Sequence, residues 1–210
     1  MKKLLFLILL IPQFSIAQKK IFQFNFDKGD ESLSFLKEDS VLNYGFWAEN
    51  IMTNDKITEA QYVSEVTARE NKRVWGNGDK WAAQWYSYKK DVYYPAFTTG
   101  LLNELNKKKT KLKMANVSGK FSTGKYYMVV VIVNIWSTWE TAIGQSNPMI
   151  DFQVQWKELA SNKTVAYCSF RTMNWDLNGP YEYGMCNRCY TECYRIAGEK
   201  IGNYIAKKLK

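Results

Sequence analysis

Three of the chain's four cysteines lie close together, in the stretch CNRCYTEC at residues 186–193. Thiols at such short spacing can form disulfides, exchange electrons or bind a metal ion. Cys186, Cys189 and Cys193 stand at positions i, i+3 and i+7, which would place them near one face of a helix. The fourth, Cys168, lies in an earlier segment with the pattern of a strand, which that helix could cover.

The amino terminus indicates the compartment in which these cysteines would act. A short positive region is followed by an apolar run at 4–11 and by small residues before Gln18. This pattern is typical of a signal peptide cleaved after Ala17, and the run is too short to span a membrane, which takes about 20 residues. We therefore expect residues 1–17 to be removed and residues 18–210 to form one globular domain, periplasmic or secreted, with no integral membrane span.

Disulfides persist outside the cytoplasm, and four cysteines allow two bridges. We expect structural disulfides drawn from Cys168, Cys186, Cys189 and Cys193, with a bridge from the strand to the helix and a bridge within one helical turn both open. Buried thiols are the alternative. We expect no metal and no cofactor, because zinc sites usually take their cysteines from two turn-forming pairs, and covalent haem needs a histidine that the chain lacks.

The absence of histidine also removes the hydrolases that depend on a Ser–His or Cys–His pair. Carboxylates remain, and Glu140, Asp151 and Glu158 could supply the two acids of a glycosidase, which stand about 5–10 Å apart. Asp151, however, falls on the outward face of a predicted strand, where a solvated carboxylate is the commoner state. We therefore expect a protein that is not an enzyme.

Aromatic residues crowd the segment 75–94, around the flexible turn GNGD. Trp75, Trp81, Trp85 and Tyr88 are candidates for a binding surface, because exposed tryptophan and tyrosine rings are favoured where proteins meet sugars or partners. The alternative is that these rings pack on the sheet, since a helix beside a sheet must bury one face.

The formal net charge is +9, and the basic run KKKTKLK at residues 107–113 ends a predicted helix. Lysines at that position complement the helix dipole. They could also contact an anionic lipid or polysaccharide. We expect no nucleic-acid partner, because the run has no interleaved aromatic residues and would lie outside the cytoplasm.

The hydrophobic pattern predicts the elements that position these residues. Strands are predicted where apolar residues alternate or run continuously, at 21–27, 40–50, 126–136, 149–157 and 163–173. Helices are predicted at 56–72, at 80–108 with a boundary near Pro95, and at 185–207. Short connections make the last strands an antiparallel meander. We expect an α+β fold, in which a mixed, largely antiparallel sheet carries helices and a closing C-terminal helix in a two-layer or three-layer sandwich.

The closing segment YGMCNRCYTECYRIAGEKIGNYIAKKLK resembles the last helix of small secreted proteins from Bacteroidetes-type bacteria. The shared features are a tyrosine, an Ala-Gly pair, a lysine, spaced aliphatic residues and a lysine-rich tail, at Tyr194, Ala197, Gly198, Lys200, Ile201, Ile205 and 207–210. The resemblance covers roughly 80–210. It implies a fold similar to the amino-terminal domain of TolB and to curli-secretion-type lipoproteins, although the chain lacks a lipobox cysteine.

This resemblance implies a role in assembly or interactions of the cell envelope rather than catalysis. We therefore expect a non-enzymatic envelope protein that binds another protein or an envelope component such as a polysaccharide, with the segment 75–94 as its contact surface. The alternative is a glycan-binding module or carboxylate-based glycosidase that uses the same aromatic residues. The sequence does not indicate the oligomeric state.

Overall fold

The computed structural model describes residues 25–29, 33–116, 124–137, 140–141, 144–145, 148–174 and 187–210. The predicted signal peptide at 1–17 lies outside these residues and stays a prediction. The predicted strand at 21–27 overlaps the first described element, β1 (Asn25–Gly29).

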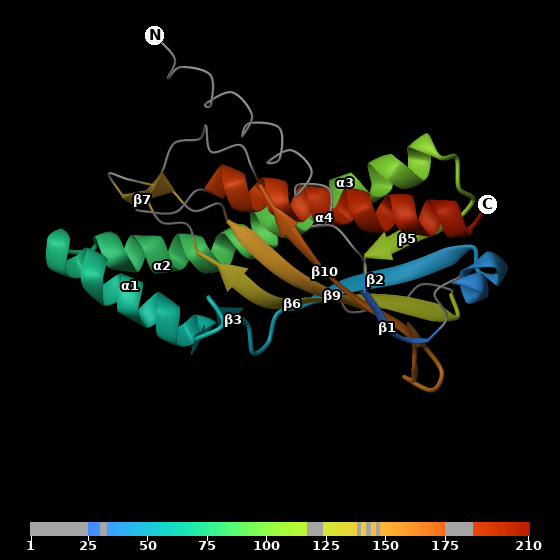
Figure 1. Ribbon diagram of the computed structural model, residues 1–210, viewed down its shortest axis with the longest axis horizontal. Helices are drawn as coiled ribbons and strands as arrows, with labels where there is room; N and C mark the ends of the chain where they lie inside the picture. The colour runs from blue at the N-terminus through green and yellow to red at the C-terminus, as the bar shows by residue number, and fades with distance from the viewer. Residues whose placement is uncertain are drawn as a thin grey trace, which may run out of the picture.

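A mixed sheet forms the centre of the fold (Figure 1). Its main strands lie in the order β1-β10-β9-β6-β2-β5. Their bounds are β2 (Val41–Trp47), β5 (Lys113–Asn116), β6 (Tyr126–Trp136), β9 (Met149–Glu158) and β10 (Thr164–Met173). The pairs β1–β10, β10–β9 and β9–β6 are antiparallel, whereas β2 is parallel to both β6 and β5. The predicted α+β class with a mixed, largely antiparallel sheet is confirmed.

Short strands complete the sheet and form a small second one. They are β3 (Met52–Thr53), β4 (Ile57–Thr58), β7 (Glu140–Thr141) and β8 (Gly144–Gln145). The strands β3 and β4 pair with each other, and β3 also lies parallel to the end of β6. The strands β7 and β8 pair only with each other within the described residues.

Alternation in sequence becomes alternation of burial on the long strands. On β9 the predicted inward residues Ile150, Phe152, Val154 and Trp156 are buried, and the residues between them are half-buried. The same alternation holds on β6 and β10. Successive side chains of a strand point to opposite faces, so the sheet has one covered and one partly open face.

The helices follow the predicted order, with η2 (Ser34–Glu38) as a short 3₁₀ turn. They are α1 (Glu59–Arg73), α2 (Asn77–Tyr88), the π-helical turn η3 (Lys89–Tyr93), α3 (Tyr94–Lys107) and α4 (Asn187–Lys208). Thr58 and Gln61 form a capping box that begins α1. The predicted boundary near Pro95 is confirmed, but the chain passes from α2 through η3 into α3 without a loop.

The helices α3 and α4 lie side by side over one face of the sheet (Figure 1). This confirms that the closing helix covers the sheet. The helices α1 and α2 form a hairpin that extends beyond the sheet at the left of Figure 1. The described helices leave the opposite face of the sheet uncovered.

Glycines bring α3 and α4 into very close contact. A Cβ at Gly198 would lie 2.0 Å from the carbonyl oxygen of Phe97, and one at Gly202 would lie 2.6 Å from that of Leu101. These two contacts advance in the same direction along both helices, so α3 and α4 are parallel. Their carboxyl ends therefore meet at the same end of the molecule.

We predict that Gly198→Ala destabilises the fold by about 3 kcal/mol, because the added methyl group would overlap the backbone of α3. The loss should appear even though alanine favours a helix over glycine by about 1 kcal/mol. Urea unfolding followed by circular dichroism measures the change. The control is Gly45→Ala on β2, where a Cβ would meet nothing within 4 Å. Equal stability of Gly198→Ala and the wild type would contradict the close packing.

Candidate functional site

Two members of the predicted aromatic surface are buried. Trp81 and Trp85 are exposed by only 1% and 3%, so neither belongs to a binding surface. Their rings stack on each other, with centroids 5.3 Å apart, and Trp85 lies edge-on to Tyr190 of α4. The prediction was wrong for these residues because α2 uses its aromatic face to join the α1–α2 hairpin to the rest of the fold.

A buried ion pair holds the same junction. Glu59 at the start of α1 pairs with Lys89 of η3 and accepts a hydrogen bond from Trp85 Nε1 at 2.6 Å. Burial lowers the pKa of Lys89, and the Glu59 carboxylate opposes that shift. Breaking such a pair leaves an uncompensated buried charge, which is why we assign it a structural role.

Trp75 is the member of the predicted surface that stays exposed, at 93%. It lies between α1 and α2, at the outer end of the hairpin, with Val74 also exposed beside it. Tyr88 is half-buried and lies against Tyr93. Of the residues predicted for the contact surface at 75–94, Trp75 at the tip of the hairpin therefore stays exposed, and Tyr86 of the same segment is also exposed.

Of the carboxylates proposed for a glycosidase, the two whose side chains the structure describes, Asp151 and Glu158, do not form a pair. Asp151 and Glu158 both lie on β9, and at about 3.3 Å per residue their positions are roughly 23 Å apart, beyond the separation of glycosidase acids. The side chain of Glu140 lies outside the described residues.

Asp151 is instead an acceptor held by its neighbours on the open sheet face. Arg171 binds both of its oxygens, and Trp136 Nε1 donates to it at 3.0 Å. Burial alone would raise the pKa of Asp151, but these hydrogen bonds and the Arg171 charge outweigh it and hold the pKa below its ordinary value. A general acid at neutral pH needs the opposite shift.

Cys168 and Cys193 are present as buried thiols. The bridge from Cys168 on the strand to the helix, which the sequence left open, is therefore not formed. Burial raises the pKa of Cys193 to about 12, which keeps its thiol protonated and unreactive. Cys189 is disulfide-bonded, as expected for a structural cysteine of this stretch. Because Cys168 and Cys193 are thiols, its partner lies outside the described residues.

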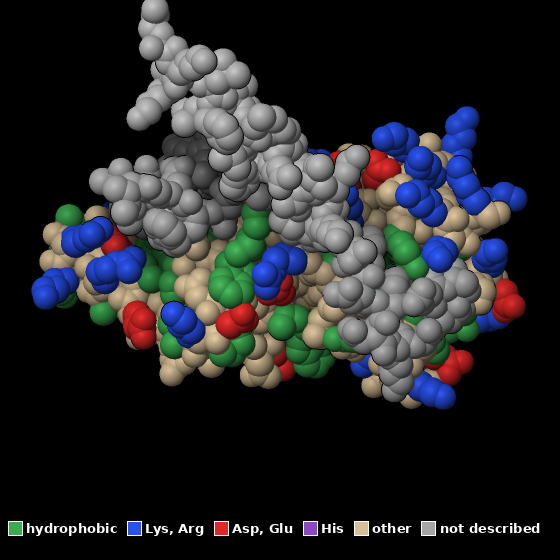
Figure 2. Space-filling view, in the orientation of Figure 1, with side chains coloured by type: hydrophobic (Ala, Val, Ile, Leu, Met, Phe, Trp, Pro, Cys, Tyr) green, Lys and Arg blue, Asp and Glu red, His purple; other side chains and the backbone are tan. Residues whose placement is uncertain are grey.

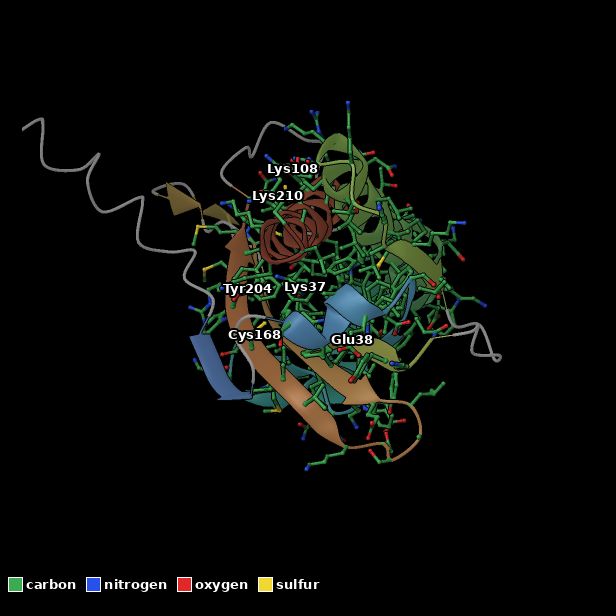
Figure 3. All side chains as sticks on the ribbon, turned by 90° about the vertical axis from the view of Figure 1, so that its right-hand side faces the viewer. Lys37, Glu38, Lys108, Cys168, Tyr204 and Lys210 are labelled. Carbon is green, nitrogen blue, oxygen red and sulfur yellow. The ribbon has the colours of Figure 1, made fainter. Side chains whose placement is uncertain are left out.

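A pocket of about 400 Å³ lies where the carboxyl ends of α3 and α4 meet. Five lysines line it, together with one carboxylate, at Lys37, Lys108, Lys109, Lys111, Lys210 and Asp39. Apolar residues, among them Leu36 and Leu209, complete its walls. Figure 3 faces this end of the molecule and labels Lys37, Lys108 and Lys210, and Figure 2 shows lysine and arginine side chains gathered there.

The end of α3 positions the basic run in this pocket. Thr110 N–H donates to the Leu105 carbonyl and Lys109 N–H to the Asn106 carbonyl, the pattern of a Schellman cap. Lys109 has φ +53°, in the left-handed region where glycine is usual. The tight turn sends Lys111 back toward η2, and Lys37 of η2 lines the same pocket.

The charges of the pocket are unbalanced. Asp39 accepts hydrogen bonds from the backbone N–H groups of Lys125 and Tyr126 at 2.8 and 3.2 Å. No carboxylate of the described residues pairs with the five ammonium groups, and the two helix ends contribute about half a negative charge each. Lysine side chains therefore outnumber the carboxylate side chains of the lining by five to one, which favours binding of an anion.

The basic run at 107–113 was recognisable in the sequence, which allowed two interpretations: lysines that complement a helix end, or lysines that contact an anion. The contributions of Lys37 and Lys210 were not, since these residues belong to distant segments of the chain. No motif links them to the run: Lys210 joins it because α4 ends beside α3, and Lys37 because η2 lines the same pocket.

Two further properties bear on function. Within the described residues, no helix combines the length and the apolar character that crossing a bilayer requires. No group of three or more Cys, Asp or Glu side chains gathers in that part of the chain as metal ligands would. The metal and redox alternatives for the CNRCYTEC stretch are not tested, because Cys186 is not among the described residues.

No protein-family model matches the chain, and no curated protein matches it. Solved bacterial structures match at low identity. PelC from Paraburkholderia phytofirmans, solved as a dodecamer, has 8% identity and a TM-score of 0.39 over 85% of this chain and 97% of PelC. A DUF330 protein from Xanthomonas campestris has 10% identity and a TM-score of 0.37 over 53% and 60% of the two chains.

A neuraminyllactose-binding hemagglutinin homologue from Helicobacter pylori has 11% identity and a TM-score of 0.33, over 81% of this chain and 86% of that one. At these values the likeness does not establish a shared family. The resemblance to TolB and curli-type proteins stays a prediction.

We predict that Trp81→Ala or Trp85→Ala destabilises the fold by about 3–5 kcal/mol, whereas Trp75→Ala changes stability by less than about 0.5 kcal/mol. The first two side chains fill the junction of the hairpin with the core, and the third is in solvent. Urea unfolding of the three variants measures the difference. A stable Trp85→Ala variant would show that the hairpin does not depend on this junction.

We predict that Asp151→Asn lowers stability by about 1–3 kcal/mol at neutral pH, because Arg171 loses its charged acceptor. Since folding lowers the pKa of Asp151, its contribution is present above the unfolded pKa of about 3.9 and is lost as pH falls through the folded value. The difference between variant and wild type should therefore shrink in acid. Urea unfolding across a pH series tests this, with Glu65→Gln on the exposed face of α1 as the control.

Proposed function

We propose that this chain is a non-enzymatic protein of the bacterial cell envelope, periplasmic or secreted, which binds an anionic envelope component in its lysine pocket. The single observation that carries the proposal is the convergence of five lysines on one pocket without matching carboxylates. The ligand is defined by its phosphate or carboxylate groups. These groups occur on polysaccharides and on lipid headgroups, and the experiment below separates the two sources.

The shape of the pocket supports binding by many weak charge contacts. Lys37, Lys111 and Lys210 are exposed and come from three separate segments, so their ammonium groups can follow the negative groups of an extended ligand. Each lysine near an anionic surface contributes about 1 kcal/mol, and the sum falls as salt screens the charges. Lysine forms point-charge contacts without fixed geometry, which suits a repeating polymer better than a single small substrate.

A binding role, as opposed to catalysis, is supported by the state of the described carboxylates. Asp151 is held by Arg171 and Trp136, and Asp39 is bound to the backbone. The alternative of a glycosidase or glycan-binding module built on 75–94 loses most of its surface, because Trp81 and Trp85 are in the core. The envelope location rests on the predicted signal peptide and on the resemblance of the closing helix.

The test compares two variants of equal net charge. In the first, Lys37, Lys111 and Lys210 are replaced by glutamine, and all three are exposed at the pocket. In the matched control, the exposed residues Lys56, Lys72 and Lys80 are replaced by glutamine. Binding is measured to polygalacturonate, to inorganic polyphosphate, and to phosphatidylglycerol vesicles at low and high salt.

We expect the wild type to bind at least one of these anions at low salt, and the pocket variant to bind at least about tenfold more weakly. The control variant should lose less than about threefold, because its lysines lie outside the pocket. Preference for a soluble polymer or for vesicles identifies the source of the anionic group. Equal losses in the two variants, or no binding by the wild type, would show that the pocket is not a binding site.

A further inference from the structure

A second hollow lies on the open face of the sheet, away from the lysine pocket. It measures about 390 Å³ and is centred on the middle of β6. Trp47 and Tyr127 are its aromatic lining, Val129 and Val131 its aliphatic floor, and Gln155, Lys157 and Asn162 its polar rim. Trp47 is exposed by 52%, at the end of β2, beyond the residues that pair with β5.

A glycine keeps this hollow open. Gly45 lies opposite Val129 on the neighbouring strand, on the same face of β2 as Trp47. A Cβ at Gly45 would meet nothing within 4 Å, so no neighbour requires a glycine there. Glycine weakens a strand interior and often marks a place where a ligand approaches the backbone closely. The missing side chain leaves room directly beside the aliphatic floor.

The register of the sheet places aromatic and polar groups around this space. Trp47 lies opposite Val131, and Tyr127 lies two residues from Val129 on the same face, so the two rings stand at opposite ends of the floor. On the other side, Gln155 lies opposite Val129 and Lys157 opposite Tyr127. Tyr127 donates its hydroxyl to Asn162 Oδ1, which fixes that amide at the rim.

The rim has hydrogen-bonding capacity that the protein does not use. Within the described part of the chain, no hydrogen bond or ion pair involves the side chains of Gln155 and Lys157, and the Nδ2 group of Asn162 has no acceptor. Such a combination suits a sugar. Its hydroxyls can form hydrogen bonds with the amide and ammonium groups, and the C–H face of its ring can pack on the aromatic ring.

We propose that this hollow binds a neutral glycan, through stacking of hexopyranose rings on Trp47 and Tyr127 and hydrogen bonds to Gln155 and Asn162. The floor runs along β6 between Tyr127 and Val131, which suits an extended chain. A β-1,4-linked glycan has flat rings with equatorial linkages, and it is the form that lies along such a face. A single ammonium group at the rim, against five in the lysine pocket, argues for a neutral ligand here.

The experiment uses cellotetraose and chitotetraose as probes, with saturation-transfer NMR and titration calorimetry on the full chain. Two variants change the hollow in different ways: Trp47→Ala removes a stacking ring, and Gly45→Val fills the space. Gly45→Val is expected to fold, because its Cβ has room and valine favours a strand. Trp75→Ala is the matched control, since it removes an even more exposed tryptophan outside the hollow.

We expect at least one probe to bind the wild type and the Trp75→Ala variant equally, with binding at least about tenfold weaker in both Trp47→Ala and Gly45→Val. Failure of both probes to bind the wild type overturns the inference, as does binding that survives both hollow variants. Sedimentation of the wild type tests the other possible occupant, a second copy of the chain. If the wild type is a dimer and Gly45→Val is a monomer, this face is a dimer interface and the inference is overturned. The glutamine variant of the lysine pocket should leave sugar binding unchanged, so the two sites are tested separately.

Discussion

The contact between α3 and α4 is the constraint on which the rest of the architecture depends. Gly198 and Gly202 let two parallel helices approach until backbone touches backbone, and this pair forms the layer that covers the sheet. Because the helices run in the same direction, their carboxyl ends coincide. The partial negative charges of the two ends add, and the lysines of α3, α4 and the following turn surround them. The basic end of the molecule is thus a consequence of helix direction as well as of composition.

The sequence predicted the elements well where the physical signal was local. Alternation in β9 and the continuous apolar run of β6 specify strands without knowledge of their partners, and the stripe through Ala197 and Ile201 specifies the closing helix. The parallel pairing of β2 with β6 could not be predicted, because parallel strands are not joined by a short turn that would identify them as partners. For the same reason the sheet-face hollow, which needs β2, β6 and β9 in register, could not be derived.

Side-chain roles were harder to predict than elements. Trp75 and Trp85 belong to the same aromatic-rich segment. Trp75 lies in solvent, whereas Trp85 is buried and donates its indole N–H to Glu59. Composition does not distinguish these two cases, since exposure depends on where the hairpin meets α4. Among the lysines, the run at 107–113 and the tail at 207–210 were visible, but their convergence with Lys37 on one pocket was not. Charge clusters that come from one segment are readable in sequence, and those assembled by the fold are not.

The late position of α4 in the chain has a consequence for folding. The residues that α4 covers, such as Phe152 and Cys168, are synthesised before that helix. Phe97 of α3 likewise precedes Gly198, the α4 residue that it contacts. Contacts between such distant segments form slowly, because loop closure costs entropy before packing repays it. Until the last helix emerges, the part of the apolar sheet face that α4 covers therefore stays exposed. A chaperone that shields extended apolar strands would have its greatest effect on this chain in that interval.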